Sequence, residues 1–265
     1  AINGVLEKNG YSLVCHIIED GQTIDTDIIR DIAADNIGAL IWSKSMEMND
    51  MEKPDFLKNA MRNLSIPVIT MEKYGFDCPG VDILFDYEKG GYMATRHLIE
   101  CGHRRIGCVA GKQSFHVTMQ RLNGYKKALE ESGISYDPDL VYFGDYTMES
   151  GYEAFSYILG QKVTAIFSMN DEMAFGIYRA ARLYGVSIPE DISIIGFDNV
   201  PFADVMQVPL TTIGVPVIEM GKKLGEKVVD LIDNKEKLKE REEILYTPRL
   251  LVRGSTKSIP PVTVI

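Results

Sequence analysis

The sequence predicts an α/β fold with two doubly wound parallel-sheet lobes. Short apolar runs alternate with segments of helical periodicity along nearly the whole chain. Most of these runs are apolar at every position, which is typical of parallel strands covered by helices on both faces. The roughly eight strand–helix units fit two sheets of about four to six strands better than one very large sheet.

The apolar runs have strand length and end at polar or turn-forming residues. The predicted strands are, in chain order, 11–17, 38–43, 66–71, 81–85, 105–111, 140–145, 164–169 and 192–197. A strand-like stretch follows at 243–256, and the tail "PPVTVI" is also strand-like. Together these runs supply strands for both sheets.

The segments between the runs carry apolar residues at helical spacing. Glycines that follow several of them, Gly102, Gly133 and Gly185, mark helix ends. The predicted helices are 24–35, 55–64, 87–101, 119–132, 149–160, 171–185 and 216–234.

No low-complexity linker separates the two lobes, so ordinary backbone must cross between them. The first crossing is predicted near residues 103–106. The predicted first lobe is 1–104 with 216–244, and the second is 105–215 with 245–265. Three crossings would form a hinge, and the cleft between the lobes would bind a ligand.

Composition and net charge limit the classes of function that the chain can have. The formal net charge is −10, from 28 basic and 38 acidic side chains, so the chain by itself is a poor nucleic-acid binder. No apolar stretch has the length of a membrane span, and the start "AINGVLEKNG" is no signal peptide. The cysteines indicate free thiols in a cytoplasmic protein: Cys15, Cys78, Cys101 and Cys108.

Polar and aromatic residues follow the predicted strands, at the ends where parallel sheets bind ligands. They are joined by Arg121, which opens a helix. Carboxylates and amides hydrogen-bond hydroxyls, arginine donates to them, and aromatic faces cover C–H groups. The set therefore suits a sugar or small polyol: Trp42, Asp86, Arg121, Tyr146, Asn170 and Asp198.

Each of these residues also has a structural alternative. Asp86 and Asn170 could instead cap helices, and Arg121 could form an ion pair with an acid. Tyr146 and Trp42 could instead pack in the core. Asp198 is hardest to explain structurally, because an acid directly after so apolar a strand needs partners or a ligand.

Motifs of catalysis and cofactor binding are missing from the sequence. It contains no GxGxxG or GxxxxGK phosphate loop, no GxSxG elbow and no evident Cys–His arrangement. Four scattered histidines lack metal-ligand spacing. We therefore expect neither an enzyme nor a resident metal or cofactor.

Several runs together resemble the lactose/galactose repressor (LacI/GalR) family of bacterial transcription regulators. They occur in the family's order over residues 2–256: "FDYEKGGYMATRHLIECGHRRIGCVAG", "QRLNGYKKALEESGI", "AIFSMNDEMAFGIYRAARLYGVSIPEDISIIGFDN" and "PLTTIGVPVIEMGKKLGEKVVDLI". The resemblance implies the two-lobed fold of periplasmic binding proteins, a small effector in the cleft and a two-fold homodimer. An effector that bridges the lobes would favour one interlobe angle and so set operator affinity.

By this resemblance, Arg121 and Asp198 hydrogen-bond the sugar, Asn170 lies in the cleft and Tyr146 stacks on the sugar ring. Asp86 falls in the family's acidic turn near the cleft. Lys112, where the family usually has proline, and Val215-Pro216, where some members have a polar cleft residue, depart from the pattern. The resemblance therefore does not identify a particular sugar.

The start of the chain, "AINGVLEKNGYSLVC", resembles the back half of the family's first helix, with Gly10 as its stop, followed by the second strand. We expect the first strand and a helix-turn-helix head to precede Ala1, and operator DNA to be bound only through that head. A transport-system sugar-binding protein is the alternative, and the sequence upstream would separate the two. An enzyme on a doubly wound fold is a third possibility, disfavoured by the absent motifs.

Overall fold

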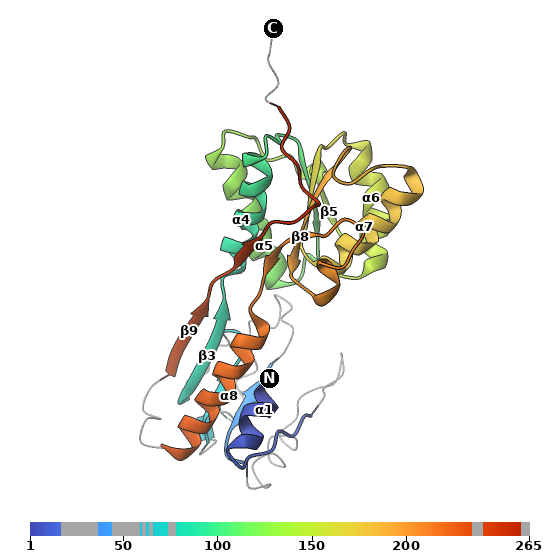
Figure 1. Ribbon diagram of the computed structural model, residues 1–265. Coiled ribbons are helices and arrows are strands. Elements are labelled where there is room, and N and C mark those ends of the chain that lie inside the picture. Colours follow the sequence, from blue (N-terminus) through green and yellow to red (C-terminus); the bar gives the residue numbers. More distant parts are fainter. Residues whose placement is uncertain are drawn as a thin grey trace. The chain divides into compact units, whose positions relative to one another are not determined.

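The computed structural model of the chain describes residues 1–16, 37–43, 59, 62–63, 66–73, 78–234 and 241–260. These residues form two compact units (Figure 1). The first contains the described residues up to Phe85 together with Pro216–Tyr246, and the second begins at Asp86 and resumes at Thr247. Each unit has its own sheet.

The second unit is built on a six-stranded sheet with the order β10-β8-β7-β6-β4-β5. All its strands are parallel except β10, which runs antiparallel to β8. The strands are β4 (Ile106–Ala110), β5 (Val141–Phe143), β6 (Ala165–Ser168), β7 (Ser193–Asp198), β8 (Thr211–Gly214) and β10 (Arg249–Leu251).

Helices cover both faces of this sheet, with α4 (Tyr87–Glu100) and α5 (His116–Glu131) on one face and α6 (Met148–Gly160) and α7 (Asp171–Tyr184) on the other (Figure 1). The strands β4 and β6 are buried at every position, as strands covered on both faces should be. This is the doubly wound arrangement that the sequence predicts.

Helices α4 and α5 approach each other very closely at two glycines. A Cβ atom on Gly91 would lie 2.2 Å from the carbonyl oxygen of Arg121, and one on Gly124 would lie 2.0 Å from that of Glu88. The two helix backbones are therefore in contact beside Arg121. This contact fixes the position of Arg121 relative to the sheet.

The first unit contains a parallel four-stranded sheet with the order β1-β2-β3-β9. Its strands are β1 (Leu40–Trp42), β2 (Val68–Thr70), β3 (Gly80–Phe85) and β9 (Arg241–Tyr246). Helix α1 (Ile2–Lys8) packs on α8 (Val217–Asp233), where Gly225 leaves room for Val5. The predicted helix end at Gly10 agrees with this, since α1 ends at Lys8 and Gly10 has φ +80°.

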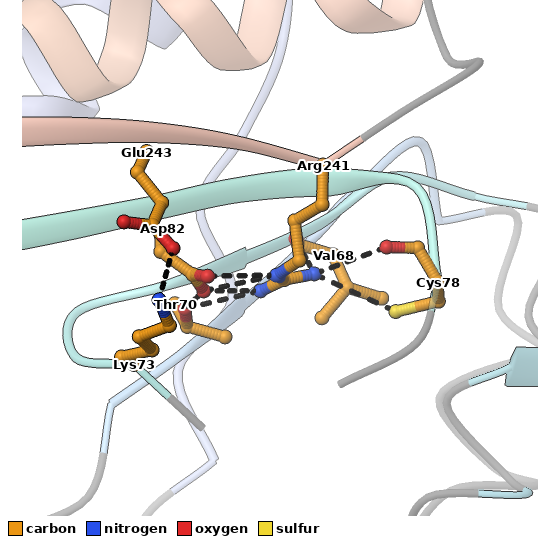
Figure 2. A network of polar contacts seen from close by, with 7 residues as sticks. All are labelled: Val68, Thr70, Lys73, Cys78, Asp82, Arg241 and Glu243. Carbon is orange, nitrogen blue, oxygen red and sulfur yellow. Dashed lines mark hydrogen bonds and ion pairs between the residues drawn. The ribbon is translucent and has the colours of Figure 1, made fainter. Parts of the chain in front are cut away.

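A polar network joins three strands of the first unit (Figure 2). The guanidinium of Arg241, on β9, donates to the carboxylate of Asp82, on β3, at 2.6 and 3.0 Å. It also donates to Thr70 Oγ1 at 3.1 Å and to the carbonyl of Cys78 at 3.2 Å. The side chain of Asp82 is 3% exposed, so this ion pair is buried and ties β9 to the sheet.

The structure corrects the predicted strands in three places. Residues 11–16 form no strand, since none of the described strands pairs with them, and Val14 is 72% exposed. Strand β8 was not predicted, since its sequence is only "TTIG". The single stretch 243–256 is two strands, β9 and β10, separated at Thr247-Pro248.

The first predicted boundary also differs from the division into units. It was placed at 104/105, but the units divide after Phe85. Helix α4 packs on α5, β7 and β8, so its apolar face belongs to the core of the second unit. The predicted helix 24–35 and the tail 261–265 lie outside the described residues, as does most of the predicted helix 55–64.

Candidate functional site

Within the second unit, the chemistry gathers at the carboxyl ends of β4, β6 and β7. The connection after β4 leads through α5 to β5 on one side, and the connection after β6 leads through α7 to β7 on the other, so the strand order reverses between β4 and β6. In doubly wound sheets such a switch point is where ligands bind. Arg121 comes from α5, which follows β4, and Asp198 is the last residue of β7.

Arg121 is the centre of this site and is only 6% exposed. Its Nη1 donates to the carbonyl of Met169, directly after β6, and its Nη2 donates to Asp198 Oδ1 at 3.4 Å. Its Nε has no hydrogen-bond partner among the described residues. A buried guanidinium held beside a partly exposed carboxylate offers donors and an acceptor to a hydroxylated ligand.

Aromatic rings surround the Arg121 guanidinium. Its Cζ lies 3.9 Å from the ring centroid of Phe197, 5.1 Å from that of Tyr87 and 5.7 Å from that of Tyr146. Rings at these distances attract a cation and restrict the orientation of its plane. Phe197 is fully buried, so it supports Arg121 from beneath the site.

Asp198 combines a strained backbone with an acid beside Arg121. Its φ is +108°, outside the region that non-glycine residues normally adopt. Burial raises the pKa of this carboxyl, and the neighbouring Arg121 charge opposes the rise. The side chain remains 36% exposed, so its oxygens are accessible from outside the core.

Tyr146 and Asn170 lie beside this pair and brace each other. Asn170 Nδ2 donates to the carbonyl of Tyr146 at 2.9 Å, while Asn170 Oδ1 accepts from Met173 N and caps α7. The hydroxyl of Tyr146 is 2.7 Å from Thr118 Oγ1, and burial raises its pKa. The structural alternative for Asn170, helix capping, is therefore realised.

Asp86 and Trp42 are placed differently. Asp86 Oδ1 accepts from Lys89 N at 2.9 Å and caps α4, so its capping alternative is also realised. The next residue, Tyr87, contributes a ring to the surroundings of Arg121. Trp42 ends β1 in the first unit and is 7% exposed. The structure thus brings together Arg121, Asp198, Tyr146 and Asn170, whereas Asp86 is linked to them only as the residue before Tyr87.

Two residues of this region escaped prediction as parts of a site. Phe197 was interpreted only as strand core, and nothing in the sequence shows that an arginine lies across its ring. Asp171 was interpreted as favouring the positive end of a helix, but it is fully buried. Its Oδ1 accepts from Thr212 Oγ1 at 2.6 Å, and its Oδ2 accepts from Val200 N at 2.9 Å.

Burial raises the pKa of Asp171 to about 6. The folded chain then holds this proton more tightly than the unfolded chain, so the contribution of Asp171 to stability is greatest below pH 4 and is lost as pH rises through 6. An amide at this position can accept from Val200 N and donate to Thr212 Oγ1 without titrating. As pH rises from 4 to 7, we expect the free energy of unfolding of Asp171→Asn to increase by about 1–3 kcal/mol relative to that of the wild type. Urea unfolding of both proteins across this range measures it, and a constant difference would contradict it.

Neither a metal centre nor a membrane span is found in the described part of the chain. No group of three or more His, Cys, Asp or Glu residues there is arranged to hold a metal ion. None of the helices there is long and apolar enough to cross a membrane. What the site offers is hydrogen bonding: a fork of donors, an acceptor and aromatic faces.

Comparisons with known proteins agree with this architecture. A family model described as a periplasmic binding protein-like domain matches residues 95–256. The chain is 33% identical over 264 residues to the "HTH-type transcriptional repressor PurR" of Photobacterium profundum, covering 97% of this chain and 77% of that protein.

Two solved structures are similar and contain a sugar. A LacI family transcriptional regulator from Enterococcus faecium with bound ribose has a TM-score of 0.81 and 27% identity, over 98% of this chain and 92% of that one. A complex of the transcriptional regulator CelR with cellobiose has a TM-score of 0.79 and 29% identity, over 96% of this chain and 76% of that one.

Proposed function

The chain belongs to the lactose/galactose repressor (LacI) family, and we propose that Arg121 and Asp198 hold its effector, a sugar or similar polyhydroxy compound. Its sequence corresponds to the effector-binding domain of the family's transcriptional regulators. The observation that carries the choice of site is the buried Arg121, whose Nη2 lies 3.4 Å from Oδ1 of the partly exposed Asp198.

A sugar suits this pair for a chemical reason. Each hydroxyl both donates and accepts a hydrogen bond, whereas an arginine only donates and an ionised aspartate only accepts. Arg121 and Asp198 together can therefore satisfy both halves of a pair of adjacent hydroxyls. The tyrosine rings at 5.1 and 5.7 Å from the guanidinium supply faces for the C–H side of a sugar. A nucleobase is the less favoured ligand.

A thermal-shift screen tests the proposal. A ligand that binds only the native state raises stability, by about 2.7 kcal/mol at a concentration 100 times its Kd. We expect a monosaccharide or small disaccharide to raise the midpoint of unfolding, and the panel should contain ribose and cellobiose. A panel in which only nucleobases stabilise the chain would contradict the sugar assignment.

Regulation would follow from linkage between the effector and the DNA-binding head that family members carry. An effector that binds one conformation better shifts the population toward it. A coupling free energy of about 1–3 kcal/mol would change operator affinity about 5- to 150-fold. This function consists of binding rather than catalysis, and we place it in the cytoplasm, where operator DNA is found.

We also propose that the chain forms a homodimer and has no measurable affinity of its own for operator DNA. Apolar side chains that a second copy would cover include Phe202 and Val205, which are 69% and 70% exposed. The net charge of −10 disfavours DNA. Sedimentation should give the mass of a dimer, and a gel-shift assay should show no complex. A monomer at high protein concentration would contradict the proposed dimer. A clear gel shift would contradict the proposed lack of DNA affinity.

A further inference from the structure

The turn that carries Asp198 has an unusual backbone. Asp198 has φ +108° and the next residue, Asn199, has φ +59°, so two consecutive non-glycine residues adopt left-handed conformations. Such residues cost of order 1–3 kcal/mol each and persist only where the surroundings impose them. Contacts around the turn must therefore hold these two residues in the left-handed conformation.

One side of the turn is held by Asp171, at the start of α7. Its Oδ2 accepts from the backbone N–H of Val200 at 2.9 Å, while its Oδ1 accepts from Thr212 Oγ1, on β8, at 2.6 Å. Gly196 leaves the space for this carboxylate, because a Cβ atom there would lie 2.2 Å from Asp171 Oδ1. Asp171 thus ties the end of the turn to the core of the second unit.

The other side is held by Arg253, in the segment after β10. Its Nη2 donates to Asn199 Oδ1 at 2.6 Å, and its Nη1 donates to the carbonyl of Leu210 at 2.7 Å. Its backbone N–H donates to Thr211 Oγ1 at 2.9 Å, which fixes the start of the side chain. Arg253 therefore braces Asn199 against β8.

We propose that Asp171 and Arg253 are positioning residues, which hold the turn Asp198–Val200 in its left-handed conformation and thereby aim the Asp198 carboxylate at the effector. This inference rests on the proposed function for its consequence, effector affinity, but its structural half concerns the ligand-free chain. Neither residue needs to touch the effector.

The proposed effect follows from preorganisation. If the turn relaxes to an ordinary conformation, the carboxylate leaves its position beside Arg121, and binding must restore the strained form. Restoring one strained residue costs enough to weaken affinity by about 10-fold or more. The loss should therefore appear in the affinity although the effector contacts themselves remain present in the sequence.

The variants separate positioning from general stability. Arg253→Met keeps an unbranched, largely apolar stem and removes both side-chain hydrogen bonds. Asn199→Gly tolerates the left-handed backbone but loses the acceptor for Arg253. Arg179→Met is the matched control, since the side chain of Arg179 is 52% exposed and contacts Glu149 and the Tyr152 ring on α6, away from the turn.

Asp171 is tested by a loss and a rescue. Asp171→Ala removes both bonds, whereas Asp171→Asn can still accept from Val200 N and donate to Thr212 Oγ1. If Asp171→Ala does not fold, unchanged Val200 exchange in Arg253→Met by itself overturns the proposal.

The first readout is amide hydrogen exchange of Val200 by NMR in the ligand-free chain. We expect exchange at least about 10-fold faster in Arg253→Met and Asp171→Ala, and unchanged in Asp171→Asn and Arg179→Met, with the amides of β7 unaffected in all. The second is calorimetric titration with ribose or cellobiose, where the same two variants should bind about 10-fold or more weakly. The double variant Arg253→Met with Asn199→Gly should be no weaker than Arg253→Met alone.

Unchanged Val200 exchange in both Arg253→Met and Asp171→Ala would overturn the proposal, whether or not a sugar binds. Faster exchange with unchanged sugar affinity would overturn its link to the effector. A wild-type chain that binds neither ribose nor cellobiose nor any other sugar would instead contradict the proposed function, while the exchange measurement would still decide whether the two residues hold the turn.

Discussion

Replacing Arg121 with alanine, or Asp198 with asparagine, is expected to weaken sugar binding by about 100-fold or more, because each change leaves a buried polar group unpaired. Arg121→Ala removes the guanidinium and its hydrogen-bond donors. The carbonyl of Met169 and the carboxylate of Asp198 then lose the donor group that they share. Asp198→Asn can turn an amide N–H toward the guanidinium, so two donors would face each other.

Calorimetric titration with a sugar that stabilises the wild type measures this loss. Circular dichroism should show that both variants remain folded, and Arg121→Lys tests whether a single charge can replace the fork. The exposed Arg179 provides the control, since Arg179→Ala should leave affinity unchanged. Wild-type affinity in both Arg121→Ala and Asp198→Asn would contradict the assignment.

Replacing Arg241 with methionine is expected to destabilise the first unit by about 3–5 kcal/mol, because it leaves the buried Asp82 carboxylate without its counter-charge. The carboxylate is 3% exposed and receives three hydrogen bonds from this one guanidinium at 2.6 to 3.0 Å (Figure 2). The loss also frees β9 from Thr70, on β2.

The only tryptophan, Trp42, is buried in the first unit, so its fluorescence during urea unfolding reports on this unit. Lys73→Met is the matched control: it breaks an ion pair with Glu243 whose side chains are 64% and 47% exposed, and it should cost less than about 1 kcal/mol. Combining Arg241→Met with Asp82→Asn should recover part of the loss. Equal effects of Arg241→Met and Lys73→Met would contradict the account.

Much of the second unit could be predicted because strands such as β4 are apolar throughout and because Gly102, Gly133 and Gly185 mark the ends of α4, α5 and α7. Asp198 could be selected as a candidate because an acid directly after "ISIIGF" contrasts with the apolar strand before it. The predicted strand 11–17 was wrong over residues 11–16: they have the composition of a strand, but none of the described strands pairs with them. Strand β8 was missed because four residues carry too little pattern.

The support of the site could not be predicted in the same way. Arg121 and Phe197 are far apart in the sequence, and only the close crossing of α4 and α5 brings the guanidinium onto the ring. Asp171 has the sequence position of a helix-start acid, yet its carboxylate is buried and bonded to Thr212 and Val200. Such contacts depend on which strands become neighbours, so a local pattern does not contain them.

The central claim, that Arg121 and Asp198 hold a sugar effector, is tested most directly by a crystal structure of the chain with the sugar that gives the largest thermal shift. We predict that hydroxyl oxygens of this sugar lie within about 3.2 Å of the Arg121 guanidinium and of the Asp198 carboxylate. A bound sugar that contacts neither side chain would contradict the claim.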